Sequence, residues 1–524
     1  MSTEGTNYNM FYVARVALIV ALGGFLMGFD ASVISGVVGF IDVEFNLNEV
    51  QKGFAVACLT FSAAFAMLVA GPLSDRLSRR KVLYIAALLY AVSAIGSALA
   101  PNYITLVIAR MIGGLGVGAS LIIAPMYIAE ISPASARGKM VSFNQLNIVI
   151  GISVAFFTNY LILQLSKSDV SWAQSFGFDQ YTWRWMLGLE TLPALLYFVA
   201  LNFVPRSPRW LIMNEQYDDA LAVMKKAVNE DYAFHEMEDI KSSIASDKER
   251  NKPKLSELFS PAMKFVLTIG IVVAILQQIT GINSVFFYAP MIFEQSGIGT
   301  DASFVQAILV GLINLVFTII AIIFIDRIGR KPLLVGGVAG IVICMFLLAY
   351  GFNSATYTLS SEALASLPAE IDKSQLTALV DTTFENDIDF KNSLQTALGS
   401  EAAKVFESKI ITAAISMKPM LILFGILGFV ASFAISVGPV MWVLLSELFP
   451  NRLRGLAISF VGFINSAVSF LVQLVFPWEL ANFGSALTFL IYGIFAVIGL
   501  VFVIMVVPET KGKSLEELET MLIK

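Results

Sequence analysis

Long uncharged stretches recur along this chain of 524 residues. A helix that crosses a bilayer needs about 20 mostly apolar residues, and that length is reached at 53–74, 140–166, 265–293, 302–325, 332–361, 419–446 and 480–508. Hydropathy over the whole chain predicts twelve spans, at 12–38, 52–72, 82–100, 103–126, 140–164, 184–204, 263–292, 302–325, 332–352, 418–446, 455–476 and 484–507. We therefore expect an all-α membrane protein with twelve transmembrane helices.

Basic residues follow spans two, four, eight and ten. They are Arg76, Arg79, Arg80, Lys81, Arg137, Lys139, Arg327, Arg330, Lys331, Arg452 and Arg454. By the positive-inside rule these loops are cytoplasmic. With an even number of spans, both termini are then expected in the cytoplasm, in a multi-pass protein of the cell (inner or plasma) membrane.

The sequence repeats itself. DRLSRRK at 75–81 matches DRIGRK at 326–331, and Glu130 with Arg137 matches Glu447 with Arg454 at the same spacing. This repeat predicts two six-helix halves, at 1–204 and 263–524. Such parallel repeats place a substrate site between the halves near the bilayer midplane.

Two further segments interrupt the repeat. The copies are 251 residues apart at the first motif and 317 apart at the second, so about 66 residues are inserted at 353–417, between spans nine and ten on the outer face. The segment 205–262 between the halves has mixed charge and helix-like stretches. We expect cytoplasmic amphipathic helices in 205–262 and an external cap with short helices in 353–417.

Composition excludes other classes of protein. Hydrophobic residues make up 57% and charged residues 14% of the chain, where a soluble protein has about 25% charged residues. The net charge of -5 does not indicate a nucleic-acid-binding protein. Cys58 and Cys344 lie in apolar runs and His235 stands alone in a charged segment, so no disulfide, metal site or cofactor is expected. The expected partners are a small molecule and the lipid bilayer, and we expect a monomer.

Several motifs together resemble the sugar porter family of the major facilitator superfamily. They are GFDASVISG at 28–36, PMYIAE at 125–130, RG at 137–138, QQITGIN at 277–283, GPVMW at 438–442, SELFP at 446–450 and PETKG at 508–512. The pattern is most similar to that of bacterial xylose-proton symporters. The resemblance covers nearly the whole chain except the external insert. It implies alternating access, with a monosaccharide bound between the halves and transport driven by protons.

The chain departs from the family pattern at three places. Arg206 replaces an acidic residue in PRSPR at 205–209, and Ser78 stands where the family usually has glycine. Phe287 occupies a position that is tyrosine in the xylose carriers. These departures bear on one cytoplasmic salt bridge, on a tight turn and on the identity of the sugar.

Amide side chains inside the spans are the candidate sugar ligands. Sugar hydroxyls need paired donors and acceptors, and amides supply both, whereas unpaired amides are costly in lipid. The candidates are Gln145, Gln277, Gln278, Asn283, Asn314 and Asn465, together with Trp442, whose ring suits the apolar face of a pyranose. The alternative is that the amides only join helices and that Trp442 only packs.

Three charges from separate spans share one depth. Asp30, Arg110 and Glu190 lie roughly 9–12 Å below the outer ends of spans one, four and six at 1.5 Å per residue. Buried membrane charges usually mark a transport pathway or relay. We expect Asp30 to carry the proton, with Arg110 as its partner and Glu190 nearby; a purely structural ion pair is the alternative.

Charges at the cytoplasmic ends of the spans are duplicated in both halves. We expect Asp75, Arg76, Glu130, Arg137, Asp326, Arg327, Arg330, Glu447 and Arg454 to form a gate that holds the inside closed in the outward-facing state. Single surface pairs contribute only about 0–1 kcal/mol, so a solvated role is the alternative for any one of them.

Three other functions remain open. A passive sugar uniporter and a nontransporting sugar sensor share the fold. An enzyme is disfavoured because no acid-base or metal constellation accompanies the spans. The residues do not discriminate among xylose, glucose, galactose, arabinose and inositol.

Overall fold

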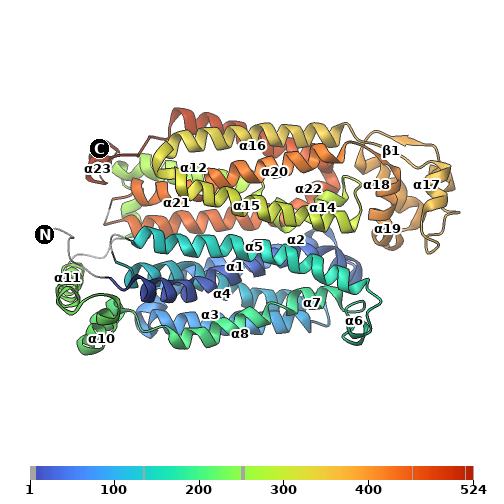
Figure 1. Ribbon diagram of the computed structural model, residues 1–524. Helices are drawn as coiled ribbons and strands as arrows, with labels where there is room; N and C mark the ends of the chain where they lie inside the picture. Colours follow the sequence, from blue (N-terminus) through green and yellow to red (C-terminus); the bar gives the residue numbers. More distant parts are fainter. Residues whose placement is uncertain (1–7, 134–135, 250–253, 451, 514, 523–524) are drawn as a thin grey trace.

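The computed structural model describes residues 8–133, 136–249, 254–450, 452–513 and 515–522, and its helices run side by side in one elongated body (Figure 1). In this described part, eleven helical segments are long and apolar enough to cross a membrane by length and composition. The last, α22 (Arg454–Met505), contains two of the predicted spans, because Gly484 interrupts it with φ 73° and ψ 168°. The prediction of an all-α membrane fold with twelve spans is confirmed.

The first half consists of five long helices and one broken one. They are α1 (Met10–Phe45), α2 (Glu49–Leu77), α3 (Arg79–Ala98), α4 (Tyr103–Ile131), α5 (Arg137–Ser166), the short external α6 (Ser171–Ser175), and the sixth span as α7 (Thr182–Gly188), α8 (Thr191–Ala200) and the 3-10 turn Leu201–Phe203. The sixth span breaks at Leu189 and Glu190. One of the predicted coupling residues therefore lies at an interruption of its helix.

The second half contains more breaks. Its helices are α12 (Lys264–Ile279), α13 (Ile282–Phe287), α14 (Ala289–Glu294), α15 (Thr300–Ile328), α16 (Arg330–Asn353), α20 (Pro419–Ile435), α21 (Val437–Leu448) and α22, followed by α23 (Leu515–Leu522). Between the halves lie α9 (Pro208–Met213), α10 (Tyr217–Ala227), α11 (Glu230–Glu249) and the 3-10 turns Leu255–Phe259 and Pro261–Met263. In Figure 1, α10, α11 and α23 lie at the same end of the body as the N and C labels.

The insert lies at the opposite end of the body (Figure 1). It contains α17 (Ser361–Ser366), the 3-10 turn Thr377–Leu379, α18 (Asp387–Leu398), α19 (Ser400–Ala414) and an antiparallel sheet of order β2-β1-β3, from β1 (Thr356–Thr358), β2 (Thr383–Phe384) and β3 (Ile415–Ser416). Its own apolar core includes Tyr357 and Phe390, whose rings stack at 5.2 Å. The sequence predicted only helices here, since strands of two or three residues are too short to show an alternating pattern.

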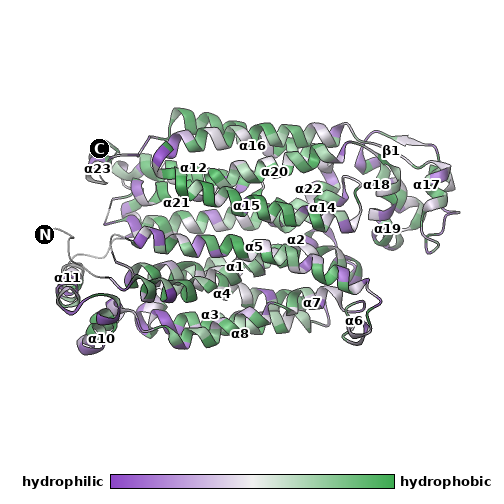
Figure 2. Cartoon of the chain, viewed as in Figure 1, coloured by the Kyte–Doolittle hydropathy of each residue, from purple (hydrophilic) through white to green (hydrophobic). Residues whose placement is uncertain are grey.

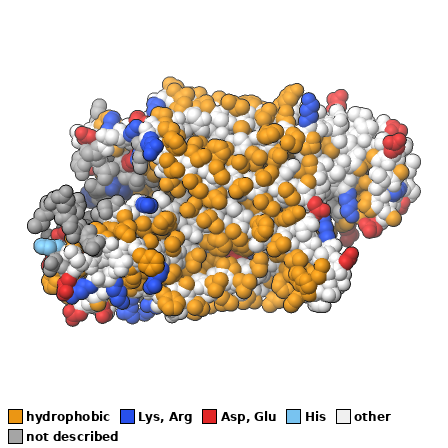
Figure 3. Space-filling view, viewed as in Figure 1, with side chains coloured by type: hydrophobic (Ala, Val, Ile, Leu, Met, Phe, Trp, Pro, Cys, Tyr) orange, Lys and Arg blue, Asp and Glu red, His pale blue; other side chains and the backbone are white. Residues whose placement is uncertain are grey.

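Hydropathy varies along the long axis of the body. Green, apolar helices fill the middle of Figure 2, and hydrophobic side chains cover the middle of the face shown in Figure 3. Charged side chains gather at both ends of that face (Figure 3). An apolar belt between two charged ends is the surface expected of a protein that crosses a bilayer.

The two halves meet along α2 and α22 and along α5 and α15. Phe61 of α2 contacts Phe470 of α22 with ring centroids 5.2 Å apart, and the Ser153 hydroxyl donates to the Gly311 carbonyl at 2.9 Å. At the end that carries the insert, Lys167, directly after α5, pairs with Asp301 of α15 at 2.6 Å. The halves are therefore in contact at the outer end as well as within the apolar belt.

Candidate functional site

The seventh span brings three amides together at a helix break. Gln277 and Gln278 end α12 and are buried, and Asn283 lies in the first turn of α13. Gly281 between them has φ 86°, a conformation that favours glycine, and a Cβ there would stand 2.5 Å from the Tyr492 ring. The break turns Asn283 back toward the end of α12.

These amides form one hydrogen-bonded cluster with Asn465 of α22. Asn283 Nδ2 donates to Gln278 Oε1 at 2.7 Å, and Gln278 Nε2 donates to Asn465 Oδ1 at 3.1 Å. Asn465 Nδ2 in turn donates to Gln277 Oε1 at 2.8 Å. Four of the predicted sugar ligands are therefore neighbours in space, and their donors and acceptors are held in fixed directions.

The cluster continues through residues that the sequence reasoning missed. Asn283 Nδ2 donates to Ser469 Oγ at 2.6 Å, and Gln473 Nε2 donates to the same oxygen at 2.8 Å. Thr60 of α2 donates to Gln473 Oε1 at 3.1 Å, which links the cluster to the first half. The signal was present in the sequence, because residues four apart share one face of a helix and Asn465, Ser469 and Gln473 have that spacing.

The other predicted sugar ligands lie apart from this cluster. Trp442 of α21 is 37% exposed, and its Cη2 lies 3.7 Å from the point where a Cβ on Gly462 would stand. Met67 of α2 approaches the same point at 3.9 Å, so the indole lies at the boundary between the halves. Gln145 is exposed on α5 and Asn314 is buried on α15. Within the described residues, the structure records no hydrogen bond from either of them to the cluster.

The three predicted coupling charges converge inside the first half. Arg110 Nη1 of α4 lies 3.4 Å from Asp30 Oδ1 of α1, and both side chains are almost completely buried. Glu190 is 2% exposed and lies within electrostatic range of both. Asp30 Oδ2, Arg110 Nε and Glu190 Oε1 are buried with no hydrogen-bond partner among the described residues. The structure thus brings together all three charges that the sequence selected.

A second glycine packs tightly against the Asp30 carboxylate. A Cβ on Gly113 of α4 would stand 2.7 Å from Asp30 Oδ2 and 2.4 Å from the Ser93 hydroxyl of α3. No side chain fits there without displacing one of these groups. Gly113 is therefore required for the close approach of α1, α3 and α4 around the charges.

The cytoplasmic charges form one cluster in each half. In the first half, Arg79 Nη2 pairs with Glu130 at 3.0 Å and Arg79 Nη1 pairs with Asp75 at 2.8 Å, while the Ser207 hydroxyl donates to Glu130. In the second half, Arg330 Nη2 pairs with Glu447 at 2.7 Å, and the Thr510 hydroxyl donates to Glu447 at 2.6 Å. Arg79 was absent from the predicted gate, although the repeat aligns it with Arg330.

The remaining predicted gate residues lie at the edges of these clusters. Arg76, Arg137 and Arg327 are exposed, and Arg454 Nε donates to the Phe449 carbonyl at 3.2 Å. The side chain of Asp326 lies outside the described part of the chain. Arg79–Glu130 and Arg330–Glu447 each lie within one half. The clusters therefore fix the ends of helices, and a gate between the halves stays a prediction.

Comparison with known proteins identifies the family to which this chain belongs. The model of the family described as sugar (and other) transporters matches residues 16–367 and 395–522. The chain belongs to the sugar transporter family. The predicted family is thereby confirmed, and its members are transporters.

Individual members of the sugar transporter family match almost the whole chain. The arabinose-proton symporter of Bacillus subtilis strain 168 is 35% identical over 522 residues, covering 99% of this chain and 97% of the relative. The D-xylose-proton symporter of Escherichia coli strain K12 is 35% identical over 548 residues, covering 98% and 97%. The inward open conformation of the xylose transporter XylE from E. coli matches with a TM-score of 0.73 at 32% identity, covering 97% of this chain and 100% of that one.

Proposed function

We propose that this chain imports a monosaccharide by proton symport with alternating access. The observation that carries the proposal is the separation of two buried polar sites, one in each half. The first half holds two carboxylates and one guanidinium, and the second half holds the amide cluster. One site is suited to protons and the other to a polyhydroxylated ligand.

The charge count of the first site supports proton coupling. Two ionised carboxylates with one arginine leave a net negative charge, and an uncompensated charge buried in a membrane is costly. A single proton bound by Asp30 or Glu190 makes the group neutral. Binding and release of that proton changes which conformation is favoured, because the halves can rearrange more easily around a neutral core.

The amide cluster supports sugar as the cargo. Asn283, Gln278 and Asn465 present both donors and acceptors in a fixed arrangement, as sugar hydroxyls require. Trp442 at the boundary between the halves adds a flat apolar surface. Pentoses and hexoses both match this chemistry, and the two relatives above are named for the pentoses arabinose and xylose.

We place both termini, α10, α11 and the charge clusters in the cytoplasm of a cell with the protein in its plasma membrane. The basic loops support this orientation through the positive-inside rule. The charge clusters at the ends of the halves would hold the inside closed in the outward-facing state. We propose that the unit that performs the cycle is a monomer, since both sites are formed within one chain.

Uptake into proteoliposomes tests this function. With an acidic exterior, the wild type should accumulate sugar inside against its gradient. Asp30→Asn should no longer accumulate sugar but should still catalyse sugar counterflow. A panel of unlabelled pentoses and hexoses competing with one labelled sugar identifies the cargo. Wild-type uptake that only equilibrates the sugar under an imposed proton gradient would indicate a uniporter, and sugar binding without counterflow would indicate a sensor.

A further inference from the structure

The charged triad is almost completely buried within the described part of the chain. Asp30 and Arg110 are each 1% exposed and Glu190 is 2% exposed. A proton that binds Asp30 or Glu190 on one side of the membrane and leaves on the other must therefore move through protein. The groups that line the cytoplasmic side of the triad decide how it moves.

Hydroxyl groups occupy that position. Tyr90 of α3, Ser120 of α4 and Tyr197 of α8 are buried to 1% exposure or less. Tyr90 OH and Ser120 Oγ have no hydrogen-bond partner among the described residues. The Tyr90 hydroxyl lies near Ser120, without a hydrogen bond of good geometry between them, and within electrostatic range of Asp30, Glu190 and Tyr197. An unsatisfied buried hydroxyl costs about 1–3 kcal/mol, so packing alone does not explain these oxygens.

The helices arrange the hydroxyls on the cytoplasmic side of the charges. At 1.5 Å per residue, Tyr197 lies about 10 Å from Glu190 along the sixth span, and Ser120 lies about 15 Å from Arg110 along α4. Gly23 of α1 allows both hydroxyls to approach the helix closely. A Cβ on Gly23 would stand 2.9 Å from the Tyr197 hydroxyl and 3.4 Å from Ser120 Oγ. The two hydroxyls thus lie against the same point of the α1 backbone.

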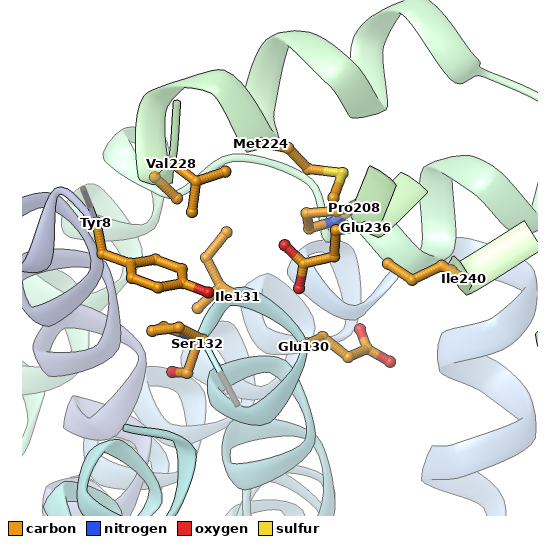
Figure 4. Close-up of a pocket in the computed structure, with 11 residues that line it drawn as sticks. Tyr8, Glu130, Ile131, Ser132, Pro208, Met224, Val228, Glu236 and Ile240 are labelled. Atoms are coloured by element: carbon orange, nitrogen blue, oxygen red, sulfur yellow. The ribbon is translucent and has the colours of Figure 1, made fainter. Parts of the chain in front are cut away.

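Further polar groups lie between these hydroxyls and the cytoplasmic surface. Tyr127 is fully buried one to two turns after Ser120 on α4, and its hydroxyl donates to the Pro205 carbonyl at 2.8 Å. Glu130 follows on the same helix and lines a pocket with Tyr8 and Glu236 (Figure 4). Burial raises the pKa of Glu236, although the nearby Arg137 acts to lower it. The raised pKa favours binding of a proton at this end.

The internal repeat provides a comparison within the same molecule. PRSPR at 205–209 and PETKG at 508–512 follow the sixth and twelfth spans and are 303 residues apart. The spacings of 251 residues for the third span, 317 for the fourth and 303 for the sixth align Tyr90 with Ile341, Ser120 with Val437 and Tyr197 with Leu500. The same spacings align Arg110 with Leu427 and Glu190 with Gly493. The fold is therefore built without these hydroxyls in the half that lacks the charges. The hydroxyls accompany the charges and not the architecture.

We propose that Tyr90, Ser120 and Tyr197 form a hydroxyl relay that carries the proton between the triad and the cytoplasmic end of the first half. The inference deepens the proposed symport and rests on it. The protonated carboxyl gives its proton to the neighbouring hydroxyl and becomes a carboxylate. Each hydroxyl accepts a proton on one oxygen lone pair and passes its own proton onward, with water in the gaps. The last proton goes to water at the cytoplasmic end, so each hydroxyl ends neutral.

Separate removal of each hydroxyl tests the relay. Tyr90→Phe, Ser120→Ala and Tyr197→Phe keep most of the side-chain volume and remove one oxygen each. Net proton-driven sugar uptake should slow roughly 100-fold, the low end of what positioned proton transfer contributes. Counterflow should be unchanged, because the carrier exchanges sugar without releasing its proton. In D2O, net uptake by the variants should fall by a larger factor than that of the wild type, since proton transfer has become the slow step.

Tyr103→Phe is the matched control. It removes a tyrosine hydroxyl of α4 near the outer end, where Tyr103 donates to the Gln51 carbonyl at 3.0 Å, and it should behave as wild type. Thermal melting with and without sugar establishes which variants fold, and Ser120→Ala decides alone if the tyrosine variants do not. A wild-type ratio of net uptake to counterflow in the folded relay variants would overturn the relay. A wild type that moves no protons with sugar would instead overturn the symport itself.

Discussion

At Ser78 the backbone adopts a conformation that usually requires glycine. Ser78 has φ 91° and ψ 149°, and its equivalent Gly329 has φ 108° and ψ 163°. In the second half, the Glu509 carboxylate accepts from the amides of Arg330 and Lys331 at 3.1 Å and caps α16. A Cβ on Gly329 would stand 2.7 Å from Glu509 Oε2. A glutamate that caps the helix from this position therefore leaves no room for a side chain at the preceding turn residue.

The first half has a side chain at this turn and no capping glutamate. Arg206 stands where the second half has Glu509, so no carboxylate caps α3 from that position. Ser78 caps the helix itself by accepting from the Lys81 amide at 3.3 Å. The two departures from the family pattern, which look unrelated in the sequence, thus have one structural cause.

This pairing predicts a coupled result for two substitutions. Ser78→Gly alone should leave the melting temperature nearly unchanged, because replacing an N-cap by glycine costs only a few tenths of a kcal/mol and glycine adopts the positive φ of this turn without strain. Arg206→Glu alone should lower the melting temperature, since the carboxylate meets the Ser78 side chain. The double variant should melt higher than the sum of the two single effects predicts, and strictly additive effects would show that the two sites are independent.

Gln278→Ala and Asn283→Ala should each weaken sugar binding. A lost hydrogen bond with a buried partner costs about 1–3 kcal/mol, which is roughly 5- to 150-fold in affinity. Each variant also removes a neighbour of the other amides, so the double variant should lose less than the product of the two factors. Titration calorimetry measures this, and wild-type affinity in both single variants would remove the cluster from the sugar site.

At the scale of elements, the insert is joined to both halves. Lys404 of α19 lies 3.6 Å from Asp42 and donates to the Asn46 side chain at 3.3 Å, both in the first half. On the other side, Gln295 donates to Glu407 of the insert at 3.2 Å. Because outward opening separates the halves at this end, the Lys404 contacts have to break during the cycle.

Lys404→Ala should therefore favour the outward-open state without abolishing transport. Hydrogen–deuterium exchange should rise in 42–52, where α1 joins α2. Lys409→Ala is the matched control on the same helix, since Lys409 pairs with Glu370 inside the insert at 3.8 Å. In this control variant, hydrogen–deuterium exchange in 42–52 should not change. Replacement of 353–417 by a short flexible linker should leave measurable uptake. Loss of all transport in a folded linker variant would show that the insert is part of the transport cycle.

The sequence predicted helices better than their interruptions. Spans one to five appear as continuous helices because their apolar length alone determines them. The breaks at Glu190, Gly281 and Ser436 depend on what each backbone meets in space, as the Tyr492 ring beside Gly281 shows. The charges Asp30, Arg110 and Glu190 were predicted because a charge inside an apolar run is unusual. Ser120 and Tyr197 were not, because hydroxyls are common in such runs and only their burial beside Gly23 distinguishes them.

At the scale of the whole molecule, the repeat in the sequence determined the two halves, and tertiary contacts determined how they meet. The outer-end pair Lys167–Asp301 and the mid-membrane bond from Ser153 to Gly311 join segments from different halves. No spacing in the sequence predicts such pairs. The proposed symport requires that these contacts open and close in step with proton and sugar binding.

Direct measurement of proton movement with sugar tests the proposed symport most sharply. Proteoliposomes with a pH-sensitive dye inside receive an inward sugar gradient at equal pH on both sides, with the membrane potential clamped to zero. Sugar entry should acidify the lumen in the wild type. Asp30→Asn should show no sugar-driven acidification while its counterflow continues. Sugar entry without acidification in the wild type, or undiminished acidification in Asp30→Asn, would contradict proton symport through Asp30.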